Sequence, residues 1–373
     1  MKLLVSALEH SANLHLKALM DQLPDSVELT GIFSAELGEP IVDLRSLAVM
    51  GFVDALKKLP FFLKLGREMT ERAADADKVL LMDASGFNLP LAKKIKKRYP
   101  DKEVIYYILP QAWAWRKGRI PLLARTCDRL LSILPFEPKY YPPTAPIAYV
   151  GHPLLDEIPK LKTAEMIRPP SEKEARRIAY LPGSRRGEIR RLMPDFHALR
   201  RALPPHEATI VIPPYFTEDE VDELYGDLGA FTIAHDTHEV LYRSDFAFVC
   251  SGTATLEAAL IGTPFVLAYR AKPLDLFLVR HLTDLKYAGL ANLFSLDFQG
   301  RPMHPELIQE DLNASALLAA YREFDIDRYR RDVDALRAYL GHGSSRNVAE
   351  ILQRGTSQRA IPLRTAEEEF SSA

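Results

Sequence analysis

Short apolar runs rich in β-forming residues alternate with helical patterns along almost the whole chain, and this alternation occurs twice. The first series runs from residue 3 to residue 150, and the second runs from residue 177 to residue 268. Apolar strands separated by helices are typical of parallel sheets that are covered by helices. A polar stretch punctuated by prolines, 153–170, separates the two series and predicts a linker. The pattern therefore predicts an α/β protein with two successive Rossmann-like halves.

The length of 373 residues also favours two domains, because a single hydrophobic core rarely grows so large. We expect an N-terminal domain over residues 1–160 and a C-terminal domain over residues 161–345. A final helix with a frayed tail is expected over residues 346–373. In open α/β sheets, ligands bind beyond the carboxyl ends of the strands. Two such domains with parallel sheets predict a cleft between them, with the functional residues at the strand ends.

Composition and motif content exclude several classes of function. A net charge of −2 gives no global field towards nucleic acid, so no nucleic-acid partner is expected. The only cysteines, Cys127 and Cys250, lie in apolar runs, which indicates reduced thiols in a cytoplasmic protein. No apolar stretch is long enough to span a bilayer, so any membrane contact is expected at its surface. The sequence has neither zinc-ligand spacing nor a dinucleotide-binding glycine motif, so no metal or cofactor is predicted.

Two glycine-bearing turns in the second half, 181–188 and 250–257, each follow an apolar run and open a helical pattern. Such turns direct backbone N–H groups and a helix N-terminus towards an anion. In the first turn, Gly183 permits a tight bend, Ser184 can hold a phosphate, and Arg185 can neutralise it. The alternative is an ordinary strand-to-helix turn whose arginines lie in solvent.

The second turn surrounds Gly252 with the small residues Ser251 and Thr253, which allow a ligand to approach closely. Glu257, just past the first helical turn, can accept hydrogen bonds from ribose hydroxyls. The alternative is a hydroxyl helix cap with an acidic residue placed to suit the helix dipole. Together the two turns favour a nucleotide diphosphate that carries a sugar.

Candidate bases lie in the first half. Asp83 follows the apolar strand predicted at 78–82, where a carboxylate can act as a general base. The alternative is an aspartate that stabilises a turn or caps a helix. His10, beside Glu9 at the end of the first predicted strand, is a second candidate, although a lone histidine is more often a structural hydrogen-bonding group.

Both tryptophans of the chain, Trp113 and Trp115, lie beside Arg116. They predict either an amphipathic, anion-binding wall or core packing next to a solvated basic helix start. The segment 56–67 mixes cations with apolar bulk that includes Phe61 and Phe62. It could lie on an anionic membrane or admit acyl chains, while a solvated helix face is the commoner explanation.

The order of these motifs resembles that of the lipid-A-disaccharide synthases, which are inverting glycosyltransferases of the two-domain GT-B type. The resemblance extends to about Gln353, and its joint order is specific although no single motif is decisive. The matching segments are 48–51, 83–84, 87–88, 113–116, 134–137, 151–154, 181–185, 251–254, 256–257, 269–270 and 292–293.

This resemblance implies transfer from UDP-2,3-diacylglucosamine to 2,3-diacylglucosamine 1-phosphate (lipid X), without a metal ion. The implied products are a β-1,6-linked tetraacyl disaccharide 1-phosphate and UDP. The resemblance also implies a cytoplasmic monomer or homodimer that associates peripherally with the inner-membrane surface. Asp83 and Arg185 match an aspartate and an arginine that family activity requires.

Three groups of site residues follow from the motifs and the resemblance together. The catalytic group is Asp83, His10 and Glu9, with Asp83 favoured as the base. The donor group is Gly183, Ser184, Arg185, Ser251, Gly252, Thr253, Glu257, Tyr269, Arg270 and Asn292. The acceptor and lipid group is Ser11, Met50, Phe61, Phe62, Asn88, Trp113, Trp115 and Arg116.

The chain departs from the family in two segments. The family usually reads Gly-Glu-x-Ser-Gly-Asp where residues 8–13 read Leu-Glu-His-Ser-Ala-Asn, and Ala-Pro-Asp-Phe-Asn where residues 84–88 read Ala-Ser-Gly-Phe-Asn. Two aspartates of the family pattern are therefore replaced, by Asn13 and by Gly86, and His10 lies near the first of these positions. Two other hypotheses about the function remain open. One is another GT-B enzyme, such as a UDP-N-acetylglucosamine transferase or a 2-epimerase. The other is a non-catalytic protein that binds nucleotide sugars or lipids.

Overall fold

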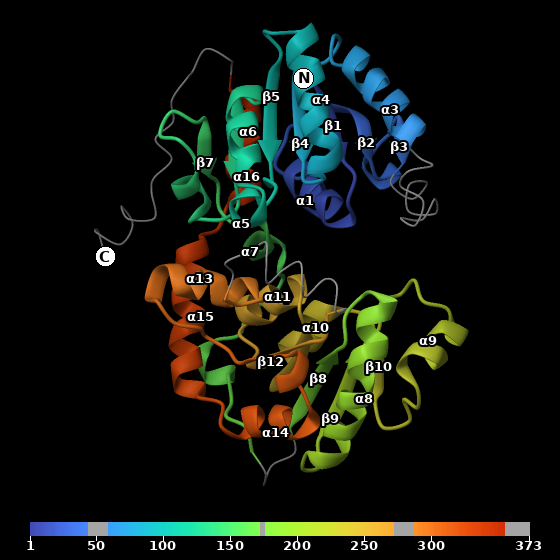
Figure 1. The fold of residues 1–373 in the computed structure, drawn as a ribbon, viewed down its shortest axis with the longest axis vertical. Helices are drawn as coiled ribbons and strands as arrows, with labels where there is room; N and C mark the ends of the chain where they lie inside the picture. The colour runs from blue at the N-terminus through green and yellow to red at the C-terminus, as the bar shows by residue number, and fades with distance from the viewer. Residues whose placement is uncertain (44–58, 172–175, 272–285, 355–373) are drawn as a thin grey trace. The chain divides into compact units, whose positions relative to one another are not determined.

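The computed structural model describes residues 1–43, 59–171, 176–271 and 286–354, and its chain divides into two compact units (Figure 1). The first unit comprises Met1–Glu157 and Leu340–Ala373, and the second comprises Ile158–Tyr339. The chain therefore leaves the first unit after Glu157 and returns to it at Leu340, so the last helix belongs with the N-terminal residues.

The first unit is built on a seven-stranded parallel sheet with the order β3-β2-β1-β4-β5-β6-β7. Its strands are β1 (Lys2–Ala7), β2 (Glu28–Phe33), β3 (Val42–Asp43), β4 (Lys78–Met82), β5 (Glu103–Tyr107), β6 (Arg129–Ser132) and β7 (Ile147–Tyr149). Its helices are α1 (His10–Met20), α3 (Leu59–Arg72), α4 (Ser85–Arg98), α5 (Ala112–Trp115), α6 (Ile120–Thr126), α7 (Pro153–Glu157) and α16 (Ser344–Gln353).

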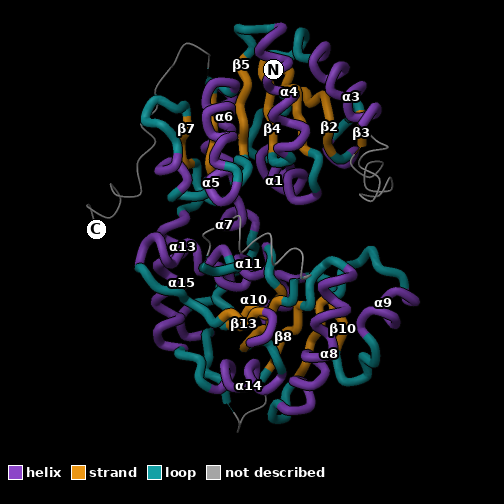
Figure 2. The backbone as a smooth tube through the Cα atoms, in the orientation of Figure 1, coloured by secondary structure: helices purple, strands orange, loops and turns teal. Residues whose placement is uncertain are grey.

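Alternate side chains of the central strand β1 enter two different cores, because successive residues of a strand point to opposite faces. Leu4 packs into a core formed with α3, α4 and α6. Leu3 and Val5 pack into a second core with α1 and α16. Helices therefore cover both faces of the sheet, as the helices and strands of Figure 2 show.

The second unit contains a six-stranded parallel sheet with the order β10-β9-β8-β11-β12-β13. Its strands are β8 (Arg177–Leu181), β9 (Glu207–Val211), β10 (Thr232–Ala234), β11 (Phe246–Cys250), β12 (Phe265–Tyr269) and β13 (Glu306–Ile308). Its helices are α8 (Arg186–Ala202), α9 (Glu218–Tyr225), α10 (Thr237–Arg243), α11 (Thr253–Ile261), α13 (Leu290–Gln299), α14 (Ala314–Arg322) and α15 (Ile326–Leu340). The predicted α/β class with two parallel sheets is confirmed.

The stretch 153–170, expected to be a linker, is packed rather than free. Its first part forms α7, in which Leu154 and Leu155 are buried. Further along, Lys162 and Ile167 are buried in the second unit, and the backbone N–H of Lys162 donates to the Ile261 carbonyl at 2.8 Å. The polar composition of this stretch does not prevent its packing, because a long side chain such as that of Lys162 buries its aliphatic part while its ammonium group donates to the Ser244 carbonyl.

No helix within the described ranges is both long and apolar enough to cross a membrane.

Candidate functional site

The carboxyl ends of β1 and β4 meet at one edge of the first sheet. The two strands pair in parallel, and Ala7 lies opposite Met82 at the end of the ladder. The turn that begins at Leu8 and the turn that begins at Asp83 therefore leave the sheet side by side. This edge carries the candidate catalytic residues.

Asp83 lies in a constrained backbone turn. Its φ is 48° and that of Ala84 is 40°, a region that non-glycine residues rarely occupy. The Asp83 N–H donates to the Ile108 carbonyl at 3.3 Å. The Asp83 carbonyl accepts hydrogen bonds from the Tyr106 hydroxyl and from the Asn88 amide. Three neighbours thus fix the peptide that carries the candidate base.

Asn88 lies behind this turn and is fully buried. Its Nδ2 donates to the Met82 carbonyl at 2.9 Å and to the Asp83 carbonyl at 3.0 Å, while its Oδ1 accepts from Ser6 Oγ at 2.6 Å. Asn88 was expected to contact the acceptor, but its amide has no exposed surface. The structure makes it a residue that joins the ends of β1 and β4 and holds Asp83.

Burial raises the pKa of Asp83. A backbone hydrogen bond at Ala84 and the charge of His15 partly oppose this effect of burial. A carboxylate that is desolvated in this way has a higher affinity for a proton, which suits a general base.

The start of α1 carries the other catalytic candidates. Glu9 occupies the N-cap position without a side-chain cap hydrogen bond, and both His10 and Ser11 are exposed at the same edge. Asn13, where the family has an acid, is buried and structural. Its Nδ2 donates to the carbonyls of Ala7 and Glu9, and its Oδ1 accepts from the Ser34 N–H at 2.7 Å.

The tryptophan segment contributes a packed ring and exposed cations. Trp113 is buried and packs edge-on against Phe136, with ring centroids 4.8 Å apart, so it lies in the core rather than in a binding wall. The side chain of Trp115 lies outside the described residues. Arg116 is exposed, and Arg119 Nη1 donates to Ser85 Oγ at 2.7 Å. The Arg119 guanidinium thus lies at the N-terminal end of α4.

The residues expected to contact lipid are either outside the described residues or partly buried. Met50 lies outside the described residues. Phe61 and Phe62 are half-buried against the core, and the Phe62 ring lies 6.0 Å from that of Phe87. The exposed apolar side chains of α3 are instead Leu59 and Leu63, which are 52% and 45% exposed.

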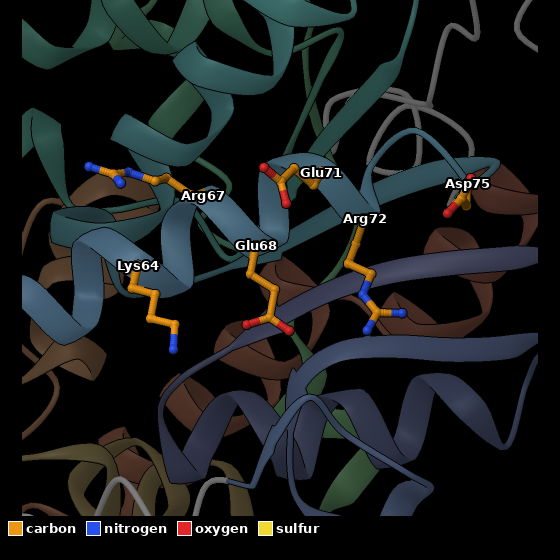
Figure 3. A pocket seen from close by; sticks show the side chains of 6 residues that line it. All are labelled: Lys64, Arg67, Glu68, Glu71, Arg72 and Asp75. Atoms are coloured by element: carbon orange, nitrogen blue, oxygen red, sulfur yellow. The ribbon is translucent and has the colours of Figure 1, made fainter.

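A shallow hollow on the rest of α3 is not part of this edge. Figure 3 shows side chains of both charge signs projecting around it from successive turns of the helix. None of its lining residues is among the predicted site residues. Its lining residues are Lys64, Arg67, Glu68, Glu71, Arg72 and Asp75.

In the second unit, the two glycine turns also leave one edge, since Leu181 of β8 lies opposite Val249 of β11. Gly183 has a φ of 106°. A Cβ at this position would lie 2.9 Å from Glu188 Oε2 and 3.1 Å from Cys250 Sγ. Both its conformation and its close packing therefore require glycine.

Arg185 is the most exposed cation of the first turn, with 83% of its side chain accessible. Its Nη1 donates to the buried carboxylate of Glu188 at 2.9 Å, within the first turn of α8. Ser184 is exposed, and its carbonyl accepts from the Tyr215 hydroxyl at 2.6 Å. The turn thus presents a guanidinium that is anchored at one nitrogen.

The second turn is open at the start of α11. Gly252 is the N-cap residue, and no side chain of the described residues caps this end. Apart from its two chain neighbours, no described residue has an atom within 4 Å of where a Cβ of Gly252 would be. Ser251 is half-buried and Thr253 is exposed. Glu257 follows one turn later, and its Oε2 lies 3.8 Å from His238 Nε2. His238, at the start of α10, was not predicted from the sequence.

The other residues expected to bind the UDP-sugar donor make contacts within the protein. Arg270 donates to Asp195 at 3.0 Å and to the carbonyls of Gln309 and Leu312 at 3.1 and 2.6 Å. Tyr269 is half-buried and packs against the core of the unit.

Asn292, also expected at the donor, is fully buried in α13. Its Nδ2 donates to the His304 carbonyl at 3.0 Å and to Glu306 Oε1 at 2.8 Å. Its Oδ1 accepts from the N–H groups of Met303 and His304. The side chain therefore acts as an internal brace between α13 and the start of β13.

Among the described residues, no group of three or more His, Cys, Asp or Glu side chains could hold a metal ion.

A buried acid lies near Trp113, beyond the end of β6. Ser132 Oγ donates to Glu137 Oε2 at 2.5 Å, and Glu137 Oε1 is buried without a hydrogen-bond partner among the described residues. Burial raises the pKa of Glu137 to about 7, opposed by the Ser132 hydrogen bond.

Sequence comparison gives one consistent result. A family model described as lipid-A-disaccharide synthetase matches residues 3–346. The lipid-A-disaccharide synthase of Helicobacter pylori is 46% identical over 359 residues, which cover 93% of this chain and 96% of the relative. The enzyme of the same name from Campylobacter jejuni is 42% identical over 367 residues, which cover 94% and 98%.

Solved structures of other proteins share the fold at low identity. Acinetobacter baumannii MurG is 14% identical with a TM-score of 0.58, and the match covers 94% of this chain and 99% of that one. A Methanocaldococcus jannaschii UDP-GlcNAc 2-epimerase, solved with UDP-GlcNAc and UDP, is 13% identical with a TM-score of 0.59 and covers 95% and 100%. At this identity the similarity concerns the fold alone.

The buried Glu137 predicts an unusual pH dependence of stability. Because its folded pKa is raised to about 7, the folded state keeps a proton that the unfolded chain loses near its ordinary value of 4.5. The free energy of unfolding should therefore fall as pH rises from about 4.5 to 7, by up to about 3 kcal/mol. Glu137→Gln should remove this fall and be the more stable protein at pH 8.

Denaturant unfolding followed by tryptophan fluorescence reports on the first unit, which contains both tryptophans. Glu71→Gln, on the exposed face of α3, is the matched control and should behave as the unaltered protein does. An equal pH slope in Glu137→Gln and the unaltered protein would contradict the buried-acid interpretation.

Proposed function

Because the chain belongs to the lipid-A-disaccharide synthetase family, we propose that it condenses UDP-2,3-diacylglucosamine with lipid X, and we assign the two substrates to its two units. The assignment rests chiefly on one observation. Two glycine turns leave the same edge of the second sheet, and the first carries an exposed guanidinium. This arrangement suits a diphosphate, and the constrained Asp83 turn of the first unit suits a base.

The donor is assigned to the second unit. The diphosphate is held by Arg185 and by backbone N–H groups at the uncapped start of α11, where Gly252 leaves room for close approach. Glu257 accepts hydrogen bonds from the ribose hydroxyls, with His238 beside it. Arg270 and Asn292 support this binding by holding the surrounding backbone.

The acceptor is assigned to the first unit. Its phosphate is held by Arg116 and Arg119 at the N-terminal end of α4, where Ala84 offers no side-chain cap and the helix dipole favours an anion. This arrangement brings the acceptor to the turn that carries Asp83. His10 and Glu9, exposed at the adjacent turn, complete the rim of the same site.

The chemistry then needs one base and one stabilised leaving group. The Asp83 carboxylate takes the proton of the acceptor 6-hydroxyl, whose oxygen attacks the anomeric carbon of the donor from the face opposite UDP. The bond from that carbon to the diphosphate oxygen breaks, and UDP leaves with the electron pair. Arg185 and the N–H groups stabilise the charge that develops on the diphosphate.

We propose further that α3 contacts the membrane surface from the cytoplasmic side. Leu59 and Leu63 lie one helical turn apart and are both about half exposed, and the cations Lys64 and Arg67 follow them. Apolar residues beside cations on one helix are typical of a segment that lies on anionic lipid. This contact would bring the protein close to its acylated substrates.

Two substitutions should separate catalysis from donor binding. Asp83→Asn should lower kcat about 100- to 10,000-fold, the range for a lost general base, and leave UDP affinity unchanged.

Arg185→Ala should weaken UDP binding about 10- to 100-fold, as expected for a lost charge-assisted contact. Arg190→Ala, on the same helix and paired with Glu223, is the control for Arg185. The measurements are steady-state kinetics and calorimetric titration with UDP.

Near-normal turnover of Asp83→Asn would remove this residue as the base. Unchanged UDP affinity in Arg185→Ala would place the diphosphate elsewhere.

The membrane proposal predicts the behaviour of a double variant. Leu59→Ser with Leu63→Ser should lower the affinity for vesicles containing phosphatidylglycerol about tenfold or more, because two half-exposed side chains lose their apolar burial. Ile233→Ser, which removes an equally exposed apolar side chain from the second unit, is the control. Vesicle co-sedimentation measures the effect, and equal binding of the double variant and the unaltered protein would exclude α3 as the contact.

A further inference from the structure

An exposed tyrosine lies beside the first glycine turn of the second unit. Tyr215, in the loop between β9 and α9, is 64% exposed, and its hydroxyl donates to the Ser184 carbonyl at 2.6 Å. This carbonyl belongs to the peptide bond that joins Ser184 to Arg185. Because β9 pairs in parallel with β8, the loop leaves the sheet at the same edge as the first glycine turn. Tyr215 thus offers accessible aromatic surface next to the residue that carries the exposed guanidinium.

The loop that carries Tyr215 is tied to α8 and to the core of the second unit. The Phe216 ring packs against that core, with its centroid 4.8 Å from that of Tyr215 and 5.8 Å from the Arg186 guanidinium. Thr217 begins α9 with a capping box, in which its N–H donates to Glu220 Oε2 at 3.0 Å. Glu220 also pairs with Arg186 of α8. These contacts hold the ring of Tyr215 in place before a ligand arrives, which lowers the conformational entropy lost on binding.

The loop and the residues assigned to the ribose lie on different groups of helices. Helices α8, α9 and α14 supply buried side chains to one core, against which Phe216 packs. His238 and Glu257 lie on α10 and α11, which pack on each other, and the described residues of these two helices are not members of that core. A donor with its diphosphate at the two glycine turns and its ribose at Glu257 can therefore extend its other end, the acylated sugar, towards Tyr215.

We propose that Tyr215 is a specificity-determining residue of the donor site, and that its exposed ring packs against the acylated glucosamine of the UDP-sugar. The proposal rests on the proposed assignment of the diphosphate to Arg185 and the two glycine turns. A tyrosine ring covers a large apolar area with few rotatable bonds, while its hydroxyl keeps a polar partner. Tyr215 thus provides a surface for the apolar part of the donor beside the cation that holds its diphosphate, and it favours the acylated donor over UDP alone.

Calorimetric titration without lipid X tests the proposal with two ligands, UDP and UDP-2,3-diacylglucosamine, at one detergent concentration. Tyr215→Ser should weaken the affinity for UDP-2,3-diacylglucosamine about tenfold and leave that for UDP within about twofold, because the ring contacts only the acylated sugar. Tyr215→Phe, which keeps the ring, should retain the affinity for the acylated donor within about threefold. Tyr140→Ser, which removes a tyrosine that is 46% exposed in the first unit, is the control and should bind both ligands as the unaltered protein does.

Arg185→Ala, titrated with UDP in parallel, separates this proposal from the proposed function. If Arg185→Ala keeps its UDP affinity, the diphosphate lies elsewhere and the Tyr215 proposal fails with that assignment. If Arg185→Ala loses UDP affinity while Tyr215→Ser binds both ligands normally, the donor site stands and the role of Tyr215 is excluded. An equal loss for both ligands in Tyr215→Ser, or a loss in Tyr215→Phe as large as that in Tyr215→Ser, would make the tyrosine structural and would also overturn the proposal.

Discussion

The side-chain amide of Asn88 joins the carboxyl ends of the strands β1 and β4, and the arrangement of the edge that carries the candidate catalytic residues depends on it. By accepting from Ser6 and donating to Met82 and Asp83, it ties β1 and β4 together at their carboxyl ends. Asp83 keeps a left-handed backbone only because this network and Tyr106 over-determine it. A fully buried, neutral residue thereby holds the turn of the half-buried acid that we propose as the base.

The second unit uses packing for the same purpose. Gly183 has a φ of 106° and lies close to Glu188 and Cys250, which together favour glycine, and Glu188 in turn anchors Arg185. The guanidinium is therefore held near the turn before any ligand binds, which reduces the conformational entropy lost on binding. In both units, buried polar contacts position one charged group just beyond the end of a strand.

The sequence predicted both parallel sheets and the strand ends at which the candidate site residues lie, because an apolar run followed by glycine or aspartate marks the end of a strand. Its motifs also led to the family, and membership in that family excludes the epimerase and non-catalytic readings. Motifs show the order of residues but not the direction of a side chain, so buried Asn292 and Trp113 were expected at ligands. The hydrogen bond between Ser6 and Asn88 joins positions 82 residues apart and has no local signal in the sequence.

As a member of its family, this chain builds a disaccharide from a UDP-activated lipid and a lipid phosphate, and we propose that the two units bind the two substrates separately. The most direct measurement follows UDP release and lipid products together, with UDP-2,3-diacylglucosamine supplied with or without lipid X. We predict UDP and a β-1,6-linked disaccharide 1-phosphate in equal amounts, and negligible UDP release when lipid X is omitted. UDP release at the same rate without lipid X, or no disaccharide when both substrates are present, would contradict the account.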